Sequence, residues 1–458
     1  MELDKALLAV GAGDRGASFD VFAETLDLAW IEQALAVTDT ATMRRRKLPA
    51  EYVVWLVIGM ALLRDRSIAE VVRHLDLVVP AADGARRTVT NGAIVQARDR
   101  LGAEPLAALF AVTAAAWATT AADTQRWRGL AVFGVDGTTL RVPDTPENEA
   151  VFGRPGTARG GAPAGYPQLR LVAVLALRSH LLAQVAVGAY RESALALAAP
   201  LWAHLPDHSL TILDRGFAVY ELFHRLGDAA RQRHWLVRAK GGQTGMKWTV
   251  VQQLGPHDHL VDLTPSRATR TKHPDLPATL RVRAVRYQRP GFRPQTLLTS
   301  LLDPVAFPAA DLATLYHERW ELELGFDEVK THTLEREEAL LRSKAPARVR
   351  QELWGLAVGY NLVRVAMARV AARAGVAPTR ISYRHALQFI RLFWLTAWTT
   401  SPGVVPRRLE ALHEELALLI LPERRPRRYP RAVKIKMSNY PRKRPCPSRP
   451  RSEHARVK

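Results

Sequence analysis

The chain has 458 residues, with 65 Lys and Arg against 44 Asp and Glu, which gives a net charge of +21. Because hydrophobic cores stop growing near about 250 to 300 residues, this length predicts about two to four domains. The apolar share of 48% and the charged share of 24% are those of a globular protein. They exclude wholesale disorder, collagen and a disulfide scaffold. The single cysteine, Cys446, cannot form an internal disulfide, so we expect folding in a reducing compartment.

Membrane insertion and secretion are not expected. The strongly apolar run at residues 52–63 is shorter than the roughly 20 residues that cross a bilayer. The longer uncharged stretch at residues 105–122 is mostly alanine with threonines, which indicates a packed helix of a soluble protein. The first ten residues, MELDKALLAV, carry early acids and lack the basic start of a secretion signal. We expect a cytoplasmic, nucleoid-associated protein.

From about residue 20 to residue 127 the sequence predicts helices, because apolar residues recur every three or four positions. Ser67 and Glu70 are spaced as a capping box at the start of one of these helices. Another helix is expected between Thr90, as its N-cap, and Gly102, as its stop.

The short helix after Thr90 predicts a DNA contact of the helix-turn-helix kind. Four of its side chains are able to contact bases or phosphates: Asn91, Gln96, Arg98 and Arg100. A solvated polar face explains the same residues equally well. A run of arginines just ahead of the second helix would add phosphate contacts: Arg44, Arg45 and Arg46, followed by Lys47.

After about residue 130 the pattern changes to apolar strands that alternate with helices, which predicts a mixed sheet covered on both faces. The expected strands are LAVFGVD, TLRVP, LRLVAVLAL, LLAQVAVGAY, LTILD and HWLVRAK. Residues 243–295 lose helical periodicity and predict an inserted β subdomain. Its piece LRVRAVRY is expected to turn Leu280, Val282 and Ala284 inward and Arg281 and Arg283 outward. Helices then return from about Asp311 to the end of LEALHEELALLI.

Two of the expected strands end in an aspartate, Asp136 before Gly137 and Asp214 before Arg215. Ligands collect at strand ends in sheets of this kind, so the two carboxylates are candidate ligands of a divalent metal. Each alone is weak evidence, because an aspartate at a strand end often caps the following turn.

A third acid comes from the helix that begins near Asp311. Tyr316, Arg319, Glu323 and Lys330 fall within about 60° on one helical face, at about 100° per residue. Glu321 and Glu328 point elsewhere, whereas Asp327 lies near enough to the stripe to rival Glu323. An i,i+4 ion pair between Arg319 and Glu323 would explain two of the four residues.

The spacing Y-x2-R-x3-E-x6-K within YHERWELELGFDEVK resembles the glutamate helix of the DDE transposases of bacterial insertion sequences, in particular the insertion element 4 group. The V-D-G context of Asp136 and the D-R-G-F context of Asp214 resemble the first two acids of that family. The N-terminal stretch RRRKLPAEYVVWLVIGMALL and the basic KIKMSNYPRKR are also similar to it, so the resemblance spans nearly the whole chain.

The resemblance implies an RNase H-like catalytic core in which Asp136, Asp214 and Glu323 are catalytic and bind two Mg²⁺ ions, with Mn²⁺ as a substitute. Hard cations prefer oxygen ligands, and a pair of ions clamps the attacking and leaving oxygens of a displacement at phosphorus. Tyr316, Arg319 and Lys330 would hold phosphates of the transposon end. The expected partner is double-stranded DNA, both element ends and target, bound by a homodimer in the synaptic complex.

In one respect the sequence departs from well-studied relatives, which stack an extruded base on a Trp before the glutamate helix. The nearest match is Gln295, and Phe292 or Trp248 is the expected substitute, since any aromatic face holds an unstacked base. In those relatives the freed 3′-hydroxyl forms a DNA hairpin. His257 and His259, in PHDH, are better explained by a loop than by metal ligation, because no cysteine is nearby.

The last 38 residues form a segment of their own, which we call the basic arm. Residues 421–458 hold fourteen Lys or Arg and two acids, a net charge of +12, together with seven prolines. Proline excludes a regular helix, so we expect an extended arm that binds nucleic acid. A solvated tail without a partner is the alternative.

The domains expected from these patterns are five. They are a helical DNA-binding domain at 1–127, a first part of the catalytic core at 128–242, the β insertion at 243–295, a second part of the core at 296–400, and a C-terminal helix with the basic arm at 401–458. The function expected is Mg²⁺-dependent cut-and-paste DNA transposition. Two alternatives stay open: a noncatalytic DNA-binding protein derived from a transposase, and a nuclease with the same core that cuts without joining.

Overall fold

The structure is a computed structural model that describes residues 26–41, 47–78, 88–155, 165–240, 246–289, 292–335, 340–397 and 404–423. The run from Arg44 to Arg46 and the basic arm beyond residue 423 lie outside the described residues.

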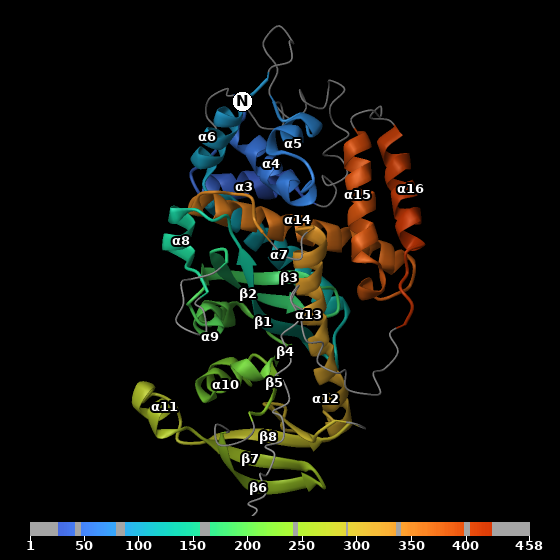
Figure 1. The fold of residues 1–458 in the computed structure, drawn as a ribbon. Coiled ribbons are helices and arrows are strands. Elements are labelled where there is room, and N and C mark those ends of the chain that lie inside the picture. Colours follow the sequence, from blue (N-terminus) through green and yellow to red (C-terminus); the bar gives the residue numbers. More distant parts are fainter. Residues whose placement is uncertain are drawn as a thin grey trace, which may run out of the picture.

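Helices make up the N-terminal end of the molecule (Figure 1). They are α3 (Leu28–Val37), α4 (Ala50–Leu62), α5 (Ile68–His74), α6 (Asn91–Leu101) and α7 (Glu104–Thr124). The expected caps are confirmed: Ser67 and Glu70 form a capping box on α5, and the Thr90 side chain accepts from the Ala93 backbone amide at the start of α6. Helix α6 ends at Gly102, whose φ of +73° is a conformation that glycine adopts without penalty.

Helix α7 is the one helix in the described part of the chain that is long and apolar enough to cross a membrane. It packs against α3, α14 (Pro346–Arg373) and strand β3 (Leu181–Ala189). Its buried face includes Leu106, Leu109 and Phe110. A helix that contacts a sheet and two helices at once is a core helix, as the sequence predicts.

Within the described residues nine strands form one mixed sheet in the order β3-β2-β1-β4-β5-β9-β8-β7-β6. Strand β1 runs parallel to β4, and β4 runs parallel to β5, whereas all other neighbours are antiparallel. The remaining strands are β1 (Ala131–Arg141), β2 (Gln168–Ala176), β4 (Ser209–Leu213), β5 (Arg233–Arg238), β6 (Lys247–Gly255), β7 (Asp258–Thr264), β8 (Leu280–Tyr287) and β9 (Gln295–Thr299). The mixed sheet predicted from the sequence is confirmed.

The β-rich insertion does not form a separate sheet. Strand β9 pairs with β5 of the core on one side and with β8 on the other, so the insertion extends the core sheet by three strands, β8, β7 and β6. The prediction that Arg283 points outward is wrong. Its side chain is fully buried and donates from Nε to Asp258 at 2.8 Å, because a carboxylate on the neighbouring strand compensates its charge.

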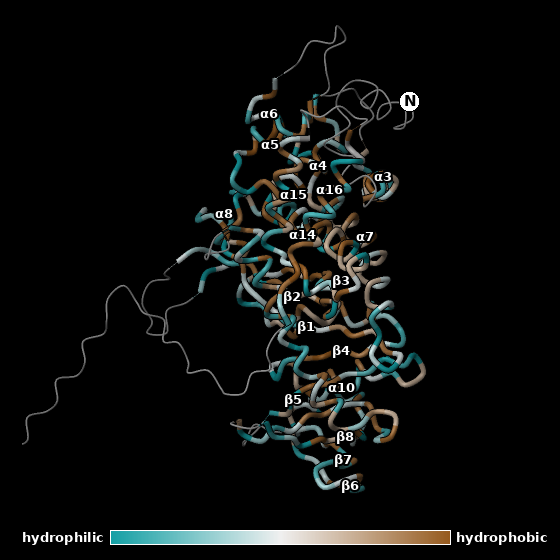
Figure 2. Tube along the Cα trace, turned by 90° about the vertical axis from the view of Figure 1, so that its right-hand side faces the viewer, coloured by the Kyte–Doolittle hydropathy of each residue, from teal (hydrophilic) through white to brown (hydrophobic). Residues whose placement is uncertain are grey.

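Two clusters of buried apolar residues cover the two faces of the sheet. The central strands are largely hydrophobic in sequence (Figure 2). Phe133 and Val135 of β1 pack into a core with Phe223 and Trp235, whereas Val132 packs into the core on the other face. The first face is covered by α9 (Ala194–Ala198), the 3₁₀ turn η1 (Ala199–His204) and α10 (Tyr220–Leu226). The short helices α8 (Pro146–Phe152) and α11 (Arg267–Lys272) lie at the periphery.

The other face carries a long helical run that we call the glutamate helix. It consists of α12 (Ala309–Leu315), the 3₁₀ turn η4 (Tyr316–Arg319), α13 (Trp320–Asp327) and the π-helical turn η5 (Glu328–Thr333). The long helix α14 lies between the sheet and the N-terminal helices, and α15 (Tyr383–Ala397) and α16 (Val405–Ala417) flank it (Figure 1).

Helix α14 crosses α4 at close range. A Cβ atom on Gly355 would come within 2.5 Å of Val57 Cγ1 and 2.8 Å of the Val57 carbonyl oxygen, so only glycine permits this approach. One turn earlier, the carboxylate of Glu352 is fully buried and accepts from Arg64 Nη1 at 2.6 Å and from the Arg342 backbone amide at 2.9 Å. We call these three residues the Glu352 junction, because they join α4 to the segment before α14.

Candidate active site

Asp136 and Asp214 lie on neighbouring parallel strands. Val135 of β1 pairs with Leu213, the last residue of β4, so the two aspartates that follow stand at the same level of the sheet. The prediction that Asp136 ends a strand is wrong, since β1 continues to Arg141 and Asp136 pairs with Ala173 of β2. It is β4 that stops. In the described part of the chain the pairing of β1 with β4 ends at Val135 and Leu213, so no β4 residue pairs with Asp136.

Asp214 leaves the sheet as a cap. Its side chain accepts from the Gly216 backbone amide at 3.4 Å at the start of the 3₁₀ turn η2 (Arg215–Phe217). Asp214 therefore has the capping role considered from the sequence. The hydrogen bond is long and uses only one of the two carboxylate oxygens. Asp136 in turn accepts from the Gly137 amide at 2.7 Å.

The glutamate helix approaches β1 through two glycines. A Cβ atom on Gly134 would lie 2.8 Å from Leu322 Cδ1, and one on Gly325 would lie 2.8 Å from Leu175 Cδ2. Because alternate residues of a strand share a face, Asp136 and Thr138 project on the same side as Gly134, toward this helix. The close approach therefore brings helix side chains to the level of Asp136.

The four residues of the sequence-derived stripe all lie on this side of the helix. The Tyr316 hydroxyl lies 3.4 Å from the carbonyl oxygen of Leu213, immediately before Asp214. Arg319 Nη2 donates to Glu323 Oε1 at 2.9 Å, which is the expected ion pair. Lys330 Nζ donates to Thr138 Oγ1 at 3.2 Å. The structure thus brings the stripe to the two aspartates.

Charges at this site are coupled. Burial raises the pKa of Asp136, the Gly137 amide lowers it, and the negative charges of Asp214 and Glu323 raise it further against the attraction of Arg319. The net pKa is above the ordinary value for an aspartate. Burial also raises the pKa of Tyr316 to about 12, so its phenol stays protonated near neutral pH. Because the charges of Asp214 and Glu323 disfavour the ionised form of Asp136, a nearby positive charge would stabilise all three carboxylates.

The donor set fits a hard divalent cation, since it offers carboxylate oxygens whose mutual repulsion a cation would relieve. Within the described ranges no three His, Cys, Asp or Glu side chains already lie close enough together to hold a metal ion. The Glu323 carboxylate pairs with Arg319, and it would have to turn to share a cation with the two aspartates. Asp327, the rival acid, is exposed, accepts from Thr331 Oγ1 at 2.7 Å and is not among the main causes of the raised pKa of Asp136.

The expected DNA contact by Arg98 is wrong. Its side chain is 3% exposed and donates to Gln351 Oε1 at 2.8 Å and to Ser343 Oγ at 3.0 Å, so it joins α6 to α14. Arg100 and Gln96 are exposed on the opposite face of α6. The helical period places Arg98 with the buried Ile94 and not with these two residues.

The structure also locates the aromatic candidates. Trp248 lies on β6, four strands away from β5 and thus about 19 Å at 4.8 Å per strand, which removes it as a base platform at the site. Phe292 is half-buried in the β8–β9 connection. Tyr287, an aromatic not predicted from the sequence, is among the groups that act on the pKa of Tyr316. Its hydroxyl donates to Gln295 Oε1 at 3.2 Å, and its charge environment includes Arg238 and Arg289. Tyr287 lies opposite Gln295 because of the register between β8 and β9, which cannot be predicted from the sequence.

His257 lies in the turn between β6 and β7, and His259 lies within β7. Between them Asp258 is the buried partner of Arg283. The motif PHDH therefore contributes an ion pair of the extended sheet.

Comparison with known proteins gives two family matches. Residues 16–111 match the family described as insertion element 4 transposase N-terminal, and residues 127–362 match the transposase DDE domain. The chain is 37% identical over 417 residues to transposase InsG for insertion sequence element IS4 of Escherichia coli K12, which covers 91% of this chain and 92% of that protein. It is 33% identical over 282 residues to the putative transposase InsZ of the same strain, covering 59% of this chain and 90% of that protein.

Among solved structures, a piggyBac transposase synaptic complex with hairpin DNA aligns with 89% of this chain and 86% of that chain. The TM-score is 0.41 and the sequence identity is 11%, a likeness too low to support an inference about this chain.

Proposed function

The chain belongs to the insertion element 4 transposases, and on that premise we propose that it moves its element by cutting the inverted-repeat ends and joining them to target DNA. It is a transposase with a DDE domain, a class of enzyme that generally uses divalent metal ions. The observation that carries the proposal is geometric: Asp136 and Asp214 directly follow the paired residues Val135 and Leu213, and the helix that bears Glu323 packs closely on the same face of β1 at Gly134.

In this proposal Asp136, Asp214 and Glu323 hold two Mg²⁺ ions, with Mn²⁺ as a substitute. When bound, such ions activate a nucleophile, first water and then a DNA 3′-hydroxyl, and stabilise the departing oxygen. The chain supplies the ligands and their geometry. Arg319 pairs with Glu323 in this structure, and with a cation held by Glu323 its guanidinium would be available for a phosphate.

Tyr316, Arg319 and Lys330 would bind phosphates of the DNA end. Lys330 stands beside Thr138, which is two residues beyond Asp136 and therefore on the same face of β1, so its ammonium group extends the site along the strand. Tyr316 keeps its proton near neutral pH and therefore donates a hydrogen bond. These contacts position the backbone and read no sequence.

The test is an assay of purified protein with labelled DNA that carries the ends of its element. We expect Mg²⁺-dependent nicking at the ends followed by joined products with a second duplex. Cutting without joined products would favour a nuclease, and binding without cutting would favour a noncatalytic protein; either result contradicts the proposal. Lys330→Ala is the matched probe of phosphate binding and should bind cleaved ends more weakly than the wild-type protein does.

DNA is also proposed to contact the basic arm and the exposed Arg100 of α6, with Arg44, Arg45 and Arg46 as further contacts. Deleting residues 421–458 removes a net charge of +12. Each phosphate contact contributes about 0.9 to the slope of log K against log salt, so the deletion should flatten that slope by several units. Arg100→Ala, as the control, should change it by about 0.9 at most. An unchanged slope after the deletion would make the arm a tail without a DNA partner.

We further propose that two copies act together on paired ends, in the cytoplasm on nucleoid DNA. The mass of the complex with end DNA tests this, since a dimer with two DNA ends is expected and a monomer with one would contradict it.

A further inference from the structure

Acidic side chains line the side of the glutamate helix that faces away from Asp136. Glu318, Glu321 and Glu328 occupy this far side, and two residues of the turn between β2 and β3 contact all three of them. Arg178 pairs with Glu318 through two hydrogen bonds, Nε to Oε2 at 3.0 Å and Nη2 to Oε1 at 2.8 Å. His180 contacts both other acids.

His180 bridges two turns of the helix. Its Nε2 lies 2.7 Å from Glu321 Oε2 and its Nδ1 lies 3.2 Å from Glu328 Oε1. The side chain is 1% exposed, and its backbone has a φ of +60°, which is uncommon for a residue other than glycine. Both ring nitrogens face carboxylate oxygens, so the ring joins Glu321 to Glu328. The uncommon backbone conformation places the His180 ring between the two carboxylates, which indicates that the position of this side chain matters.

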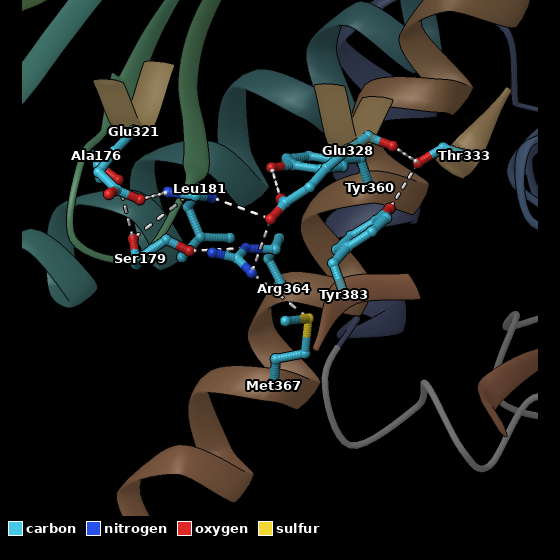
Figure 3. Close-up of polar contacts among 11 residues, drawn as sticks. Ala176, Ser179, Leu181, Glu321, Glu328, Thr333, Tyr360, Arg364, Met367 and Tyr383 are labelled. Atoms are coloured by element: carbon cyan, nitrogen blue, oxygen red, sulfur yellow. Dashed lines mark hydrogen bonds and ion pairs between the residues drawn. The ribbon is translucent and has the colours of Figure 1, made fainter. Parts of the chain in front are cut away.

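Helix α14 provides two further partners of Glu328, Tyr360 and Arg364 (Figure 3). The Tyr360 hydroxyl donates to Glu328 Oε2 at 2.8 Å, and Arg364 Nη1 lies 3.6 Å from Glu328 Oε1. Arg364 Nε also donates to the carbonyl oxygen of Ser179, so the turn and the helix share one partner. Burial alone would raise the pKa of Glu328, but Arg364 and His180 outweigh it and lower the pKa to about 2. Glu328 therefore stays ionised.

The contacts on the far side of the glutamate helix also affect the position of Glu323 on the other side. Glu323 lies between Glu321 and Glu328 in sequence, and Lys330 follows Glu328 within the π-helical turn η5. Fixing Glu318, Glu321 and Glu328 on one side fixes the rotation of the helix about its axis. That rotation decides how far the Glu323 carboxylate stands from Asp136 and Asp214.

We propose that Arg178 and His180 are positioning residues that set the rotation of the glutamate helix, and with it the place of Glu323 in the active site. The inference rests on the proposed function, because it takes Glu323 to be a metal ligand. Displacing a reacting group by about 1 Å costs about 100-fold in rate. Loss of the clamp should therefore slow cleavage without weakening DNA binding, since neither residue faces the DNA-binding stripe.

The test uses the partly exposed Arg178–Glu318 pair, whose side chains are 29% and 30% exposed, because it tolerates exchange better than the buried His180. Arg178→Glu and Glu318→Arg are made singly and together in the full-length protein. Single-turnover cleavage of labelled end DNA, affinity for that DNA and melting temperature are measured for each. The control is the same exchange at Arg373 and Glu410, an exposed pair between α14 and α16.

Each single variant should cleave about 10- to 100-fold more slowly with unchanged DNA affinity, and the double variant should regain most of the lost rate. The control variants should cleave at the wild-type rate. If a single variant loses cooperative melting, Arg178→Gln takes its place in the same comparison. This substitution removes the positive charge without reversing it. Single variants that cleave at the wild-type rate, or a double variant no faster than the singles, would overturn the inference alone. Wild-type protein that does not cleave would overturn the proposed function as well.

Discussion

Replacing Asp136 by Asn is expected to abolish Mg²⁺-dependent cleavage while binding to end DNA survives. A metal ion supplies several kcal/mol of stabilisation to a phosphoryl-transfer transition state, which corresponds to roughly three powers of ten in rate. Asp214→Asn and Glu323→Gln should behave in the same way, because each removes one proposed ligand. The measurement is single-turnover cleavage of labelled end DNA beside an affinity measurement on the same DNA.

Replacing Asp136 by Asn should also raise the melting temperature of the protein. The pKa of Asp136 is raised, so the folded protein binds the proton more tightly than the unfolded chain does, and the ionised carboxylate destabilises the fold. This penalty is fully present above the folded pKa and disappears as the pH falls through it. Asparagine removes the penalty near neutral pH, so a catalytic loss should accompany a gain in stability.

Asp327→Asn is the matched control, because Asp327 lies on the same helix and outside the coupled acids. It should cleave at the wild-type rate. If Asp136→Asn cleaves normally, or if Asp327→Asn loses cleavage instead of Glu323→Gln, the assignment of the three acids is wrong.

The second large effect is expected on stability, at the Glu352 junction. Glu352→Ala leaves the buried Arg64 and the backbone amide of Arg342 without their acceptor, and breaking a buried pair in this way costs about 3 to 5 kcal/mol. Its side chain is 1% exposed, so water does not replace the lost contact. The free energy of unfolding, from denaturant titration, is the quantity to measure.

Glu410→Ala provides the comparison for this prediction. Glu410 pairs with Arg373 through an ion pair in which both side chains are 57% exposed, and such a pair contributes less than about 1 kcal/mol. A loss at Glu352 no greater than the loss at Glu410 would mean that the junction does not bind the N-terminal helices firmly to α14.

Local patterns in the sequence predicted the helices and strands well where one face is apolar. The caps at Ser67 and Thr90 and the strands β2, β3, β4 and β5 all follow from side chains that act within a few residues of each other. Strand β1 was divided wrongly at Gly137, because a glycine inside a strand has the same appearance as a turn. Only the pairing of β1 with β2, a long-range contact, carries the strand through to Arg141.

Buried charges were the least predictable residues. Arg98 and Arg283 both have the character of surface residues in sequence, yet each is buried with a partner that is distant along the chain or on the next strand. Charge compensation depends on register and helix packing, which periodicity does not encode. His180 was missed for the same reason, since its two acids are about 140 residues away.

The stripe on the glutamate helix was predictable because it is a property of one helix. Its four residues keep a common side although the helix includes a 3₁₀ turn and a π-helical turn, neither of which the sequence indicated. The meeting of Glu323 with Asp136 and Asp214 depends on the approach of that helix to β1 at Gly134. Gly134 carried no signal of this approach by itself.

The account depends most on the convergence of Asp136, Asp214 and Glu323 on divalent cations. Its most direct test is a crystal structure of the protein with cleaved end DNA and Mn²⁺, with anomalous scattering recorded to locate the manganese. The account predicts manganese peaks bounded by oxygens of all three carboxylates, with Glu323 turned away from Arg319. Manganese bound elsewhere, or Glu323 still paired with Arg319 in the presence of bound metal, would contradict it.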